Sequence, residues 1–222
     1  MVISNNKKFI FIHIYKTGGN SVSSLLLPYA RKREKFSQKW ISRYIINRIN
    51  KLLRLNDQGN KWINGIRKHA TALEIKDCIG DKKFAEYFKF TIVRNPYDFL
   101  VSLYHYIKQS PNHRNYQTVN SLTFKEFIIN ETKNNCHLQS DFITNNDGKL
   151  IVDYVGKLEH IDYSLSHVSR KLNIPKKNIP DSNKSERNSD EMNYYDVELL
   201  EIVNKYFKKD FELLGYKQIQ KI

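Results

Sequence analysis

From Phe9 to Ser21 the chain reads Phe-Ile-Phe-Ile-His-Ile-Tyr-Lys-Thr-Gly-Gly-Asn-Ser. The largely apolar run predicts a buried strand over 9–14, and the apolar residues beyond it predict a helix over 21–30. A strand, a glycine turn and a helix start form a typical anion site. Glycine lets the backbone approach the anion, and the first N–H groups of the helix point at it. Since Lys16 adds a positive charge there, we expect this loop to bind a phosphorylated or sulfated small molecule.

The order of residues in this loop differs from that of ATPases and GTPases. Their loop reads G-x-x-x-x-G-K-[ST], with the lysine after the glycines. Here Lys16 and Thr17 precede Gly18 and Gly19. A nucleoside-triphosphatase loop is therefore disfavoured. On this segment alone, an ordinary strand-to-helix turn with a chance lysine stays open.

A second strand-to-helix junction follows further along the chain. Residues 88–93 predict a strand, and the apolar spacing beyond them predicts a helix over 96–107. The Asn-Pro pair at 95–96 suits an N-cap and a first helical position. Arg94 lies where a parallel strand ends, and its guanidinium can donate two parallel hydrogen bonds to a phosphate. Ser102 offers one more donor, so the chain is predicted to carry two anion sites.

Together these segments resemble the sulfotransferases that use 3′-phosphoadenosine 5′-phosphosulfate (PAPS). Residues 13–21 resemble the family's H-x-P-K-T-G-G-T-S loop, and residues 93–104 resemble its 3′-phosphate motif. Residues 155–159 and 206–216 are similar to a later strand and the C-terminal helix. The likeness is strongest to the carbohydrate branch, which includes the heparan 2-O and 6-O enzymes. It implies an α/β fold in which helices flank a parallel central sheet.

The resemblance also implies roles for individual residues. The first loop would hold the 5′-phosphosulfate, and the second motif would hold the 3′-phosphate. Lys184 lies in a polar loop that closes over the nucleotide in relatives, although a solvated loop is the alternative interpretation. The implied donor-binding residues are Lys16, Thr17, Gly18, Gly19, Asn20, Ser21, Arg94, Ser102 and Lys184. No metal ion is implied.

Sulfuryl transfer requires stabilisation of charge on the leaving phosphate and a base for the acceptor hydroxyl. Lys16 suits the first task. We predict His69 as the base, because it precedes a helix between the two motifs, as the base does in the heparan branch; a helix-capping histidine is the alternative. Glu74 and Glu159 are alternative bases, although Glu159 is favoured as an orienting residue. His13 lies on the predicted strand and is interpreted as a core histidine.

Two positions depart from the family's first loop. Tyr15 replaces proline, which we expect to loosen the exit from the strand, and Asn20 replaces threonine and loses a hydroxyl.

Gln139 and Ser140 match a family segment before the third strand. For these two, contact with acceptor or nucleotide and a plain loop role both stay open.

The 222-residue chain is expected to form a single domain over 1–222. No apolar run reaches the roughly 18 to 20 residues that span a bilayer, and no signal peptide is evident. Cys78 and Cys136 have no spacing typical of metal ligands, and two unpaired cysteines fit a reducing compartment. These features favour a cytoplasmic protein of bacterial origin.

The net charge of +14 is concentrated between the loop and His69. Residues 31–68 contain 12 Lys and Arg against two acidic residues, and the apolar spacing over 36–55 predicts an amphipathic helical insert. Three interpretations stay open. The segment is a solvated face, a docking surface for an anionic glycan, or a contact with a membrane that carries a lipid-linked acceptor.

The remaining pattern alternates helices with strands, which is typical of a parallel sheet covered on both faces. Helices are expected at 71–79, 123–132, 161–172 and 195–207, and strands at 152–157 and near 217–220. Residues 109–121 are expected to form a polar loop.

The leading hypothesis is sulfonate transfer from PAPS to a hydroxyl of a glycan or glycolipid, which leaves the desulfated bisphosphate nucleotide (PAP). Two alternatives belong to other classes. A kinase or nucleotidase would need magnesium and acidic ligands near the loop, and a non-catalytic polyanion-binding protein would bind DNA or heparin in a salt-sensitive way. The chain contains no recognisable nucleic-acid motif, so nucleic acid is not expected as a partner.

Overall fold

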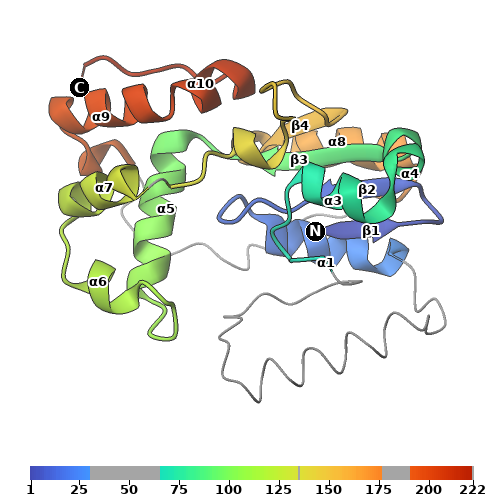
Figure 1. Ribbon diagram of the computed structural model, residues 1–222, viewed down its shortest axis with the longest axis horizontal. Coiled ribbons are helices and arrows are strands. Elements are labelled where there is room, and N and C mark those ends of the chain that lie inside the picture. The colour runs from blue at the N-terminus through green and yellow to red at the C-terminus, as the bar shows by residue number, and fades with distance from the viewer. Residues whose placement is uncertain (31–65, 135, 177–190, 222) are drawn as a thin grey trace.

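A four-stranded sheet with the strand order β1-β2-β3-β4 is the centre of the computed structural model, which describes residues 1–30, 66–134, 136–176 and 191–221 (Figure 1). The strands are β1 (Val2–Ser4), β2 (Phe9–Ile12), β3 (Phe88–Val93) and β4 (Tyr154–Lys157). β2, β3 and β4 are parallel, and β1 pairs with β2 in the antiparallel sense. This confirms the predicted α/β class.

Helices cover both faces of the sheet. On one face α1 (Gly19–Leu26) and α8 (Ile161–Leu172) pack on the aromatic side chains of β2 and β3. On the other face α3 (Ala72–Ile79) and α4 (Asp81–Glu86) pack on the alternate residues of β2. Because successive strand residues point to opposite faces, the continuous apolar run of β2 supplies both cores.

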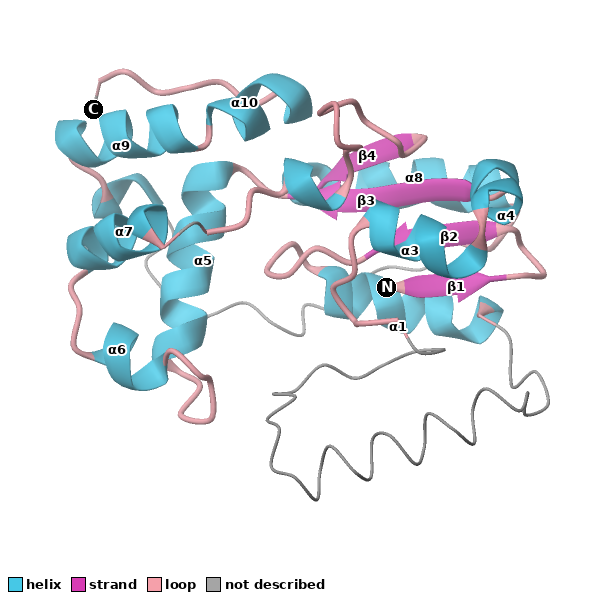
Figure 2. Cartoon of the chain, in the orientation of Figure 1, coloured by secondary structure: helices cyan, strands magenta, loops and turns pink. Residues whose placement is uncertain are grey.

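A second group of helices lies beyond the carboxyl ends of the parallel strands (Figure 2). Its long member is α5 (Pro96–Lys108), which follows β3 directly and packs with α7 (Phe124–Lys133), α9 (Val197–Tyr206) and α10 (Lys208–Leu214). The short helix α6 (Tyr116–Asn120) adds Val119 to the same core. The edge of the sheet that binds ligands in open α/β folds is therefore lined by this group.

Short 3₁₀ turns complete the described chain. They are η1 (Leu27–Tyr29), η2 (Ser140–Phe142), η3 (Leu158–His160) and η4 (Glu191–Tyr194). The first of them corrects the predicted helix over 21–30. The α-helix begins two residues earlier, at Gly19, and ends at Leu26, and the tighter turn that follows has Pro28 in its first positions.

Several other predictions are wrong or incomplete. The strand near 217–220 is absent, and the polar loop over 109–121 contains α6. The elements β1 and α4 were not predicted, and α10 lies in the range 206–216 that resembled the family's C-terminal helix. The helical insert over 36–55 and the polar loop with Lys184 lie outside the described residues.

Candidate functional site

The loop between β2 and α1 is a tight turn whose own residues hold it in place. Lys16 and Gly18 have φ angles of 61° and 74°, in the left-handed region that costs energy for a lysine. The Thr17 hydroxyl donates to the Ile14 carbonyl at 2.9 Å, and the Ser21 amide donates to the Gly18 carbonyl at 3.1 Å. The Thr17 side chain therefore closes the loop, and the prediction that Thr17 binds the donor stays a prediction.

Gly19 is needed because the loop packs directly on a histidine ring. A Cβ atom at Gly19 would lie 2.1 Å from His13 Cδ2, a distance that no side chain can adopt. His13 is 3% exposed, and its burial lowers its pKa to about 2. The interpretation of His13 as a core histidine agrees with this burial. The His13 ring packs directly against the first turn of α1.

His69 packs against the His13 ring and lies in the turn that precedes α3. Its ring centroid is 4.6 Å from that of His13, and its Nδ1 lies 2.8 Å from the His13 carbonyl oxygen. Because a carbonyl can only accept, Nδ1 carries the proton and the lone pair of the neutral ring is on Nε2. Burial lowers the pKa of His69 to about 4. The ring is therefore held in its neutral form first by burial and then by the positive charge of Lys68.

These two depressed pKa values predict that the protein loses stability in mild acid. In the unfolded chain both rings would take up protons near pH 6.5, whereas the folded chain resists protonation until about pH 4 for His69. The two buried neutral rings therefore leave the free energy of unfolding at its full value above pH 6.5 and lower it as the pH falls towards 4. Thermal denaturation between pH 7.5 and 4 measures it. We expect His69→Gln to show a shallower decrease of Tm over this range, and an unchanged slope would contradict the assigned burial.

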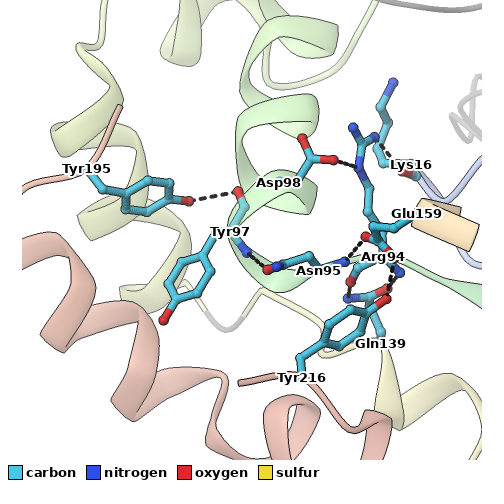
Figure 3. A network of polar contacts seen from close by, with 9 residues as sticks. All are labelled: Lys16, Arg94, Asn95, Tyr97, Asp98, Gln139, Glu159, Tyr195 and Tyr216. Carbon is cyan, nitrogen blue, oxygen red and sulfur yellow. Dashed lines mark hydrogen bonds and ion pairs between the residues drawn. The ribbon is translucent and has the colours of Figure 1, made fainter. Parts of the chain in front are cut away.

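Arg94 joins the second motif to the first. Its Nε donates to Asp98 Oδ2 at 2.6 Å, and its Nη1 donates to the carbonyl oxygen of Lys16 at 3.1 Å (Figure 3). Arg94 is 9% exposed, so its ion pair with Asp98 is largely shielded from water. The predicted Arg94 site and the predicted Lys16 site are therefore in direct contact.

One face of α5 is directed at the loop. Asn95 accepts from the Tyr97 amide at 3.1 Å, and Pro96 follows it, as the sequence predicted for the start of this helix. Ser102 is buried one turn beyond Asp98, at the spacing that places the two on the same face. Tyr106 follows at the next such position, and the Lys16 ammonium lies 4.2 Å from its ring centroid. This cation–π contact was missed, although the spacing from Asp98 is visible in the sequence.

Glu159 supports the start of α5. Its two oxygens accept from the Asn95 amide at 2.6 Å and from the Tyr216 hydroxyl at 2.9 Å (Figure 3). Glu74 is likewise engaged, in a capping box with Thr71 at the start of α3 and in an ion pair with Arg67. These contacts favour structural roles for both of the alternative bases.

The two departures from the family loop have partners. The Tyr15 ring packs on Phe99 and Phe142 with centroid distances of 5.3 and 5.8 Å and meets His69 edge-on at 6.2 Å. Three aromatic rings therefore hold Tyr15 at the exit from the strand, which does not favour the expected loosening. Asn20 is exposed, and its Oδ1 accepts from Lys68 Nζ at 2.8 Å, so a second ammonium lies at the first turn of α1.

The chain belongs to the sulfotransferase family. A sequence model of that family matches residues 1–217, which is nearly the whole chain. An uncharacterized protein of Archaeoglobus fulgidus is 29% identical over 106 residues, which cover 46% of this chain and 82% of that protein. No solved structure matched the chain. The family places the chain among sulfotransferase enzymes, which use a sulfate donor and an acceptor.

The described residues contain neither a candidate metal site nor a candidate membrane span. No group of three or more His, Cys, Asp or Glu side chains in the described ranges could hold a metal ion. Within the same ranges, no helix combines the length and the apolar character that crossing a bilayer requires.

Proposed function

We propose that the chain transfers the sulfuryl group of PAPS to a hydroxyl of a carbohydrate acceptor, as a single sulfotransferase domain over 1–222. The observation that carries this proposal is the contact between the two predicted anion sites, where Arg94 Nη1 donates to the Lys16 carbonyl. A nucleotide with phosphate groups at both its 3′ and 5′ positions matches such a pair of cationic sites. The donor set of one guanidinium, one ammonium and the amides at a helix start suits phosphate and sulfate oxygens.

On this proposal the loop residues bind the 5′-phosphosulfate. The helix α1 begins at Gly19, so the amides of Gly19 and Asn20 belong to the first turn, where N–H groups lack partners within the helix. Lys16 and these amides would stabilise the charge that develops on the leaving phosphate. In the bound state Lys16 Nζ would exchange its contact with the Tyr106 ring for an anionic oxygen.

His69 is proposed as the general base. Its Nδ1–H is held by the His13 carbonyl, so Nε2 is oriented to accept the proton of the acceptor hydroxyl as the new S–O bond forms and the S–O bond to the phosphate breaks. The pKa of about 4 keeps the ring neutral at physiological pH. The fixed tautomer follows the general pattern in which a carbonyl or carboxylate orients a catalytic imidazole.

Carbohydrate is proposed as the acceptor class from the resemblance to the heparan branch and from the charge of residues 31–68. Among the described residues, Lys68 adjoins His69 and bonds to Asn20 at 2.8 Å, so the approach to the proposed base is cationic. A cationic approach raises the local concentration of anionic acceptors. This supports an anionic glycan or glycolipid.

The transfer itself is tested with PAPS that carries labelled sulfate. We expect label in hydroxyl groups of anionic polysaccharides or glycolipids, without added magnesium, and a rate of labelling about 10²- to 10³-fold lower with the Lys16→Ala variant. Transfer only to tyrosine peptides would contradict the carbohydrate assignment. Magnesium-dependent transfer of the γ-phosphate of ATP, in place of sulfate transfer, would contradict the proposed reaction and favour a kinase.

The Arg94→Ala variant is expected to lose affinity for PAP far more than affinity for AMP, which lacks the 3′-phosphate. A bidentate charge-assisted contact is worth about 1.5–3 kcal/mol, or roughly 10- to 150-fold in Kd. Calorimetric titration with both nucleotides measures the two losses. An equal loss for both nucleotides would show that Arg94 supports the loop through Lys16 without contacting the 3′-phosphate.

A further inference from the structure

Gln139 binds the main chain of Arg94 through both atoms of its side-chain amide. The Arg94 amide donates to Gln139 Oε1 at 2.9 Å, and Gln139 Nε2 donates to the Arg94 carbonyl at 2.7 Å (Figure 3). Gln139 is fully buried, at 0% exposure. The pairing of β3 with β4 ends one residue earlier, with Val93 opposite Lys157. The glutamine amide therefore takes the place of a peptide group from a neighbouring strand at the residue where the ladder stops.

Asp210 of α10 fixes the main chain of Gln139 in turn. Its two carboxylate oxygens accept from the amides of Gln139 and Ser140, each at 2.8 Å. Asp210 is 0% exposed, and its burial is compensated by these two hydrogen bonds. A path of buried hydrogen bonds thus leads from the C-terminal helix to the residue that carries the proposed 3′-phosphate ligand.

The chemistry of this path requires an amide at position 139. A peptide unit offers one donor and one acceptor, and the side-chain carboxamides of asparagine and glutamine offer the same pair from one planar group. Glutamate would keep the acceptor and lose the donor, and leucine would lose both. Either change leaves a buried polar group of Arg94 without its partner.

The opposite end of Arg94 is held as well. Its guanidinium is bonded to Asp98 and to the Lys16 carbonyl, so the side chain has fixed partners at its tip and the main chain has fixed partners at its base. A rotation of the Arg94 backbone would move the guanidinium relative to Ser102 and to the loop. The position of Gln139 therefore bears on how the guanidinium meets a ligand.

We infer that Gln139, held by Asp210, is a positioning residue that sets the orientation of Arg94 and thereby the preference of the enzyme for a 3′-phosphorylated nucleotide. This inference rests on the proposed function. It assigns to Gln139 an indirect part in specificity, where the sequence left contact with acceptor or nucleotide and a plain loop role open.

The test is the ratio of the Kd for AMP to the Kd for PAP, measured by calorimetry on the full chain. We expect Gln139→Leu to reduce this ratio at least about tenfold, because a charged group is no longer held in register with its ligand. Gln139→Glu keeps the shape and one of the two bonds, so a smaller reduction is expected. If the leucine variant does not fold, the glutamate variant decides the outcome.

The matched control is Ser164→Ala. The Ser164 hydroxyl accepts from the Lys157 amide and donates to the Lys157 carbonyl, both at 3.1 Å, so it makes the same two-bond contact at the end of β4 without touching Arg94. We expect this variant to lower Tm and to keep the wild-type ratio. A lowered Tm with an unchanged ratio in the Gln139 variants would overturn the inference. A wild-type protein that does not distinguish PAP from AMP would instead overturn the proposed function, and the inference with it.

Discussion

Replacing His69 by alanine is expected to lower turnover about 10²- to 10⁴-fold, which is the usual contribution of a general base. The Kd for PAP is expected to stay within a few-fold of the wild-type value, because His69 faces the acceptor side of the site on this account. The physical reason is the lone pair on Nε2, which the hydrogen bond from Nδ1 to the His13 carbonyl leaves available in a ring whose pKa is about 4. Single-turnover sulfate transfer combined with calorimetric titration of PAP measures the two quantities separately.

The matched control for this prediction is His160→Ala. His160 is exposed in η3, and its loss should leave turnover unchanged. Wild-type turnover in His69→Ala would contradict the base assignment. A loss of PAP affinity as large as the loss of turnover would show that His69 supports the loop through His13 instead.

Replacing Lys16 by alanine is expected to lower turnover about 10²- to 10³-fold, as the loss of one preorganised donor to a developing negative charge does in other enzymes. Backbone strain cancels in this comparison. Lysine and alanine both carry a Cβ atom, so both are equally disfavoured at a φ of 61°. The effect on Tm should accordingly be small, apart from the loss of the contact with Tyr106.

Two further variants define what the lysine contributes. Lys16→Arg keeps the charge and should retain more turnover than Lys16→Met, which keeps only the length of the side chain. Lys82→Ala removes an exposed lysine of α4 and should have no effect on transfer. Equal activity of Lys16→Met and the wild type would show that the charge of Lys16 has no part in the reaction.

The elements that the sequence predicted correctly are those with a strong local pattern. The strand over 88–93 agrees with β3, and the helix over 161–172 agrees with α8, because each combines a clear apolar period with defined ends. The missed elements are short or depend on distant partners. β1 has three residues and exists only as the antiparallel neighbour of β2, and α6 packs through little more than Val119.

In the candidate site, too, the residues in continuous motifs were predicted and those that depend on distant partners were not. Arg94 and the loop with Lys16 were predicted because each motif is continuous in sequence, and the structure brings the two into contact. The roles of Gln139 and Asp210 could not be predicted, because the hydrogen bonds that define them join residues 45 to 71 positions apart. A buried amide that completes a strand end has no local pattern that distinguishes it from a loop residue.

The central claim, that the chain binds an adenosine phosphorylated at both its 3′ and 5′ positions, is tested most directly by calorimetric titration of the full chain at low ionic strength with PAP, ATP and AMP. We predict saturable one-to-one binding of PAP at least about tenfold tighter than that of either ATP or AMP, because only PAP offers phosphate groups to both Lys16 and Arg94. Equal affinities for all three nucleotides, or no binding of PAP, would contradict it.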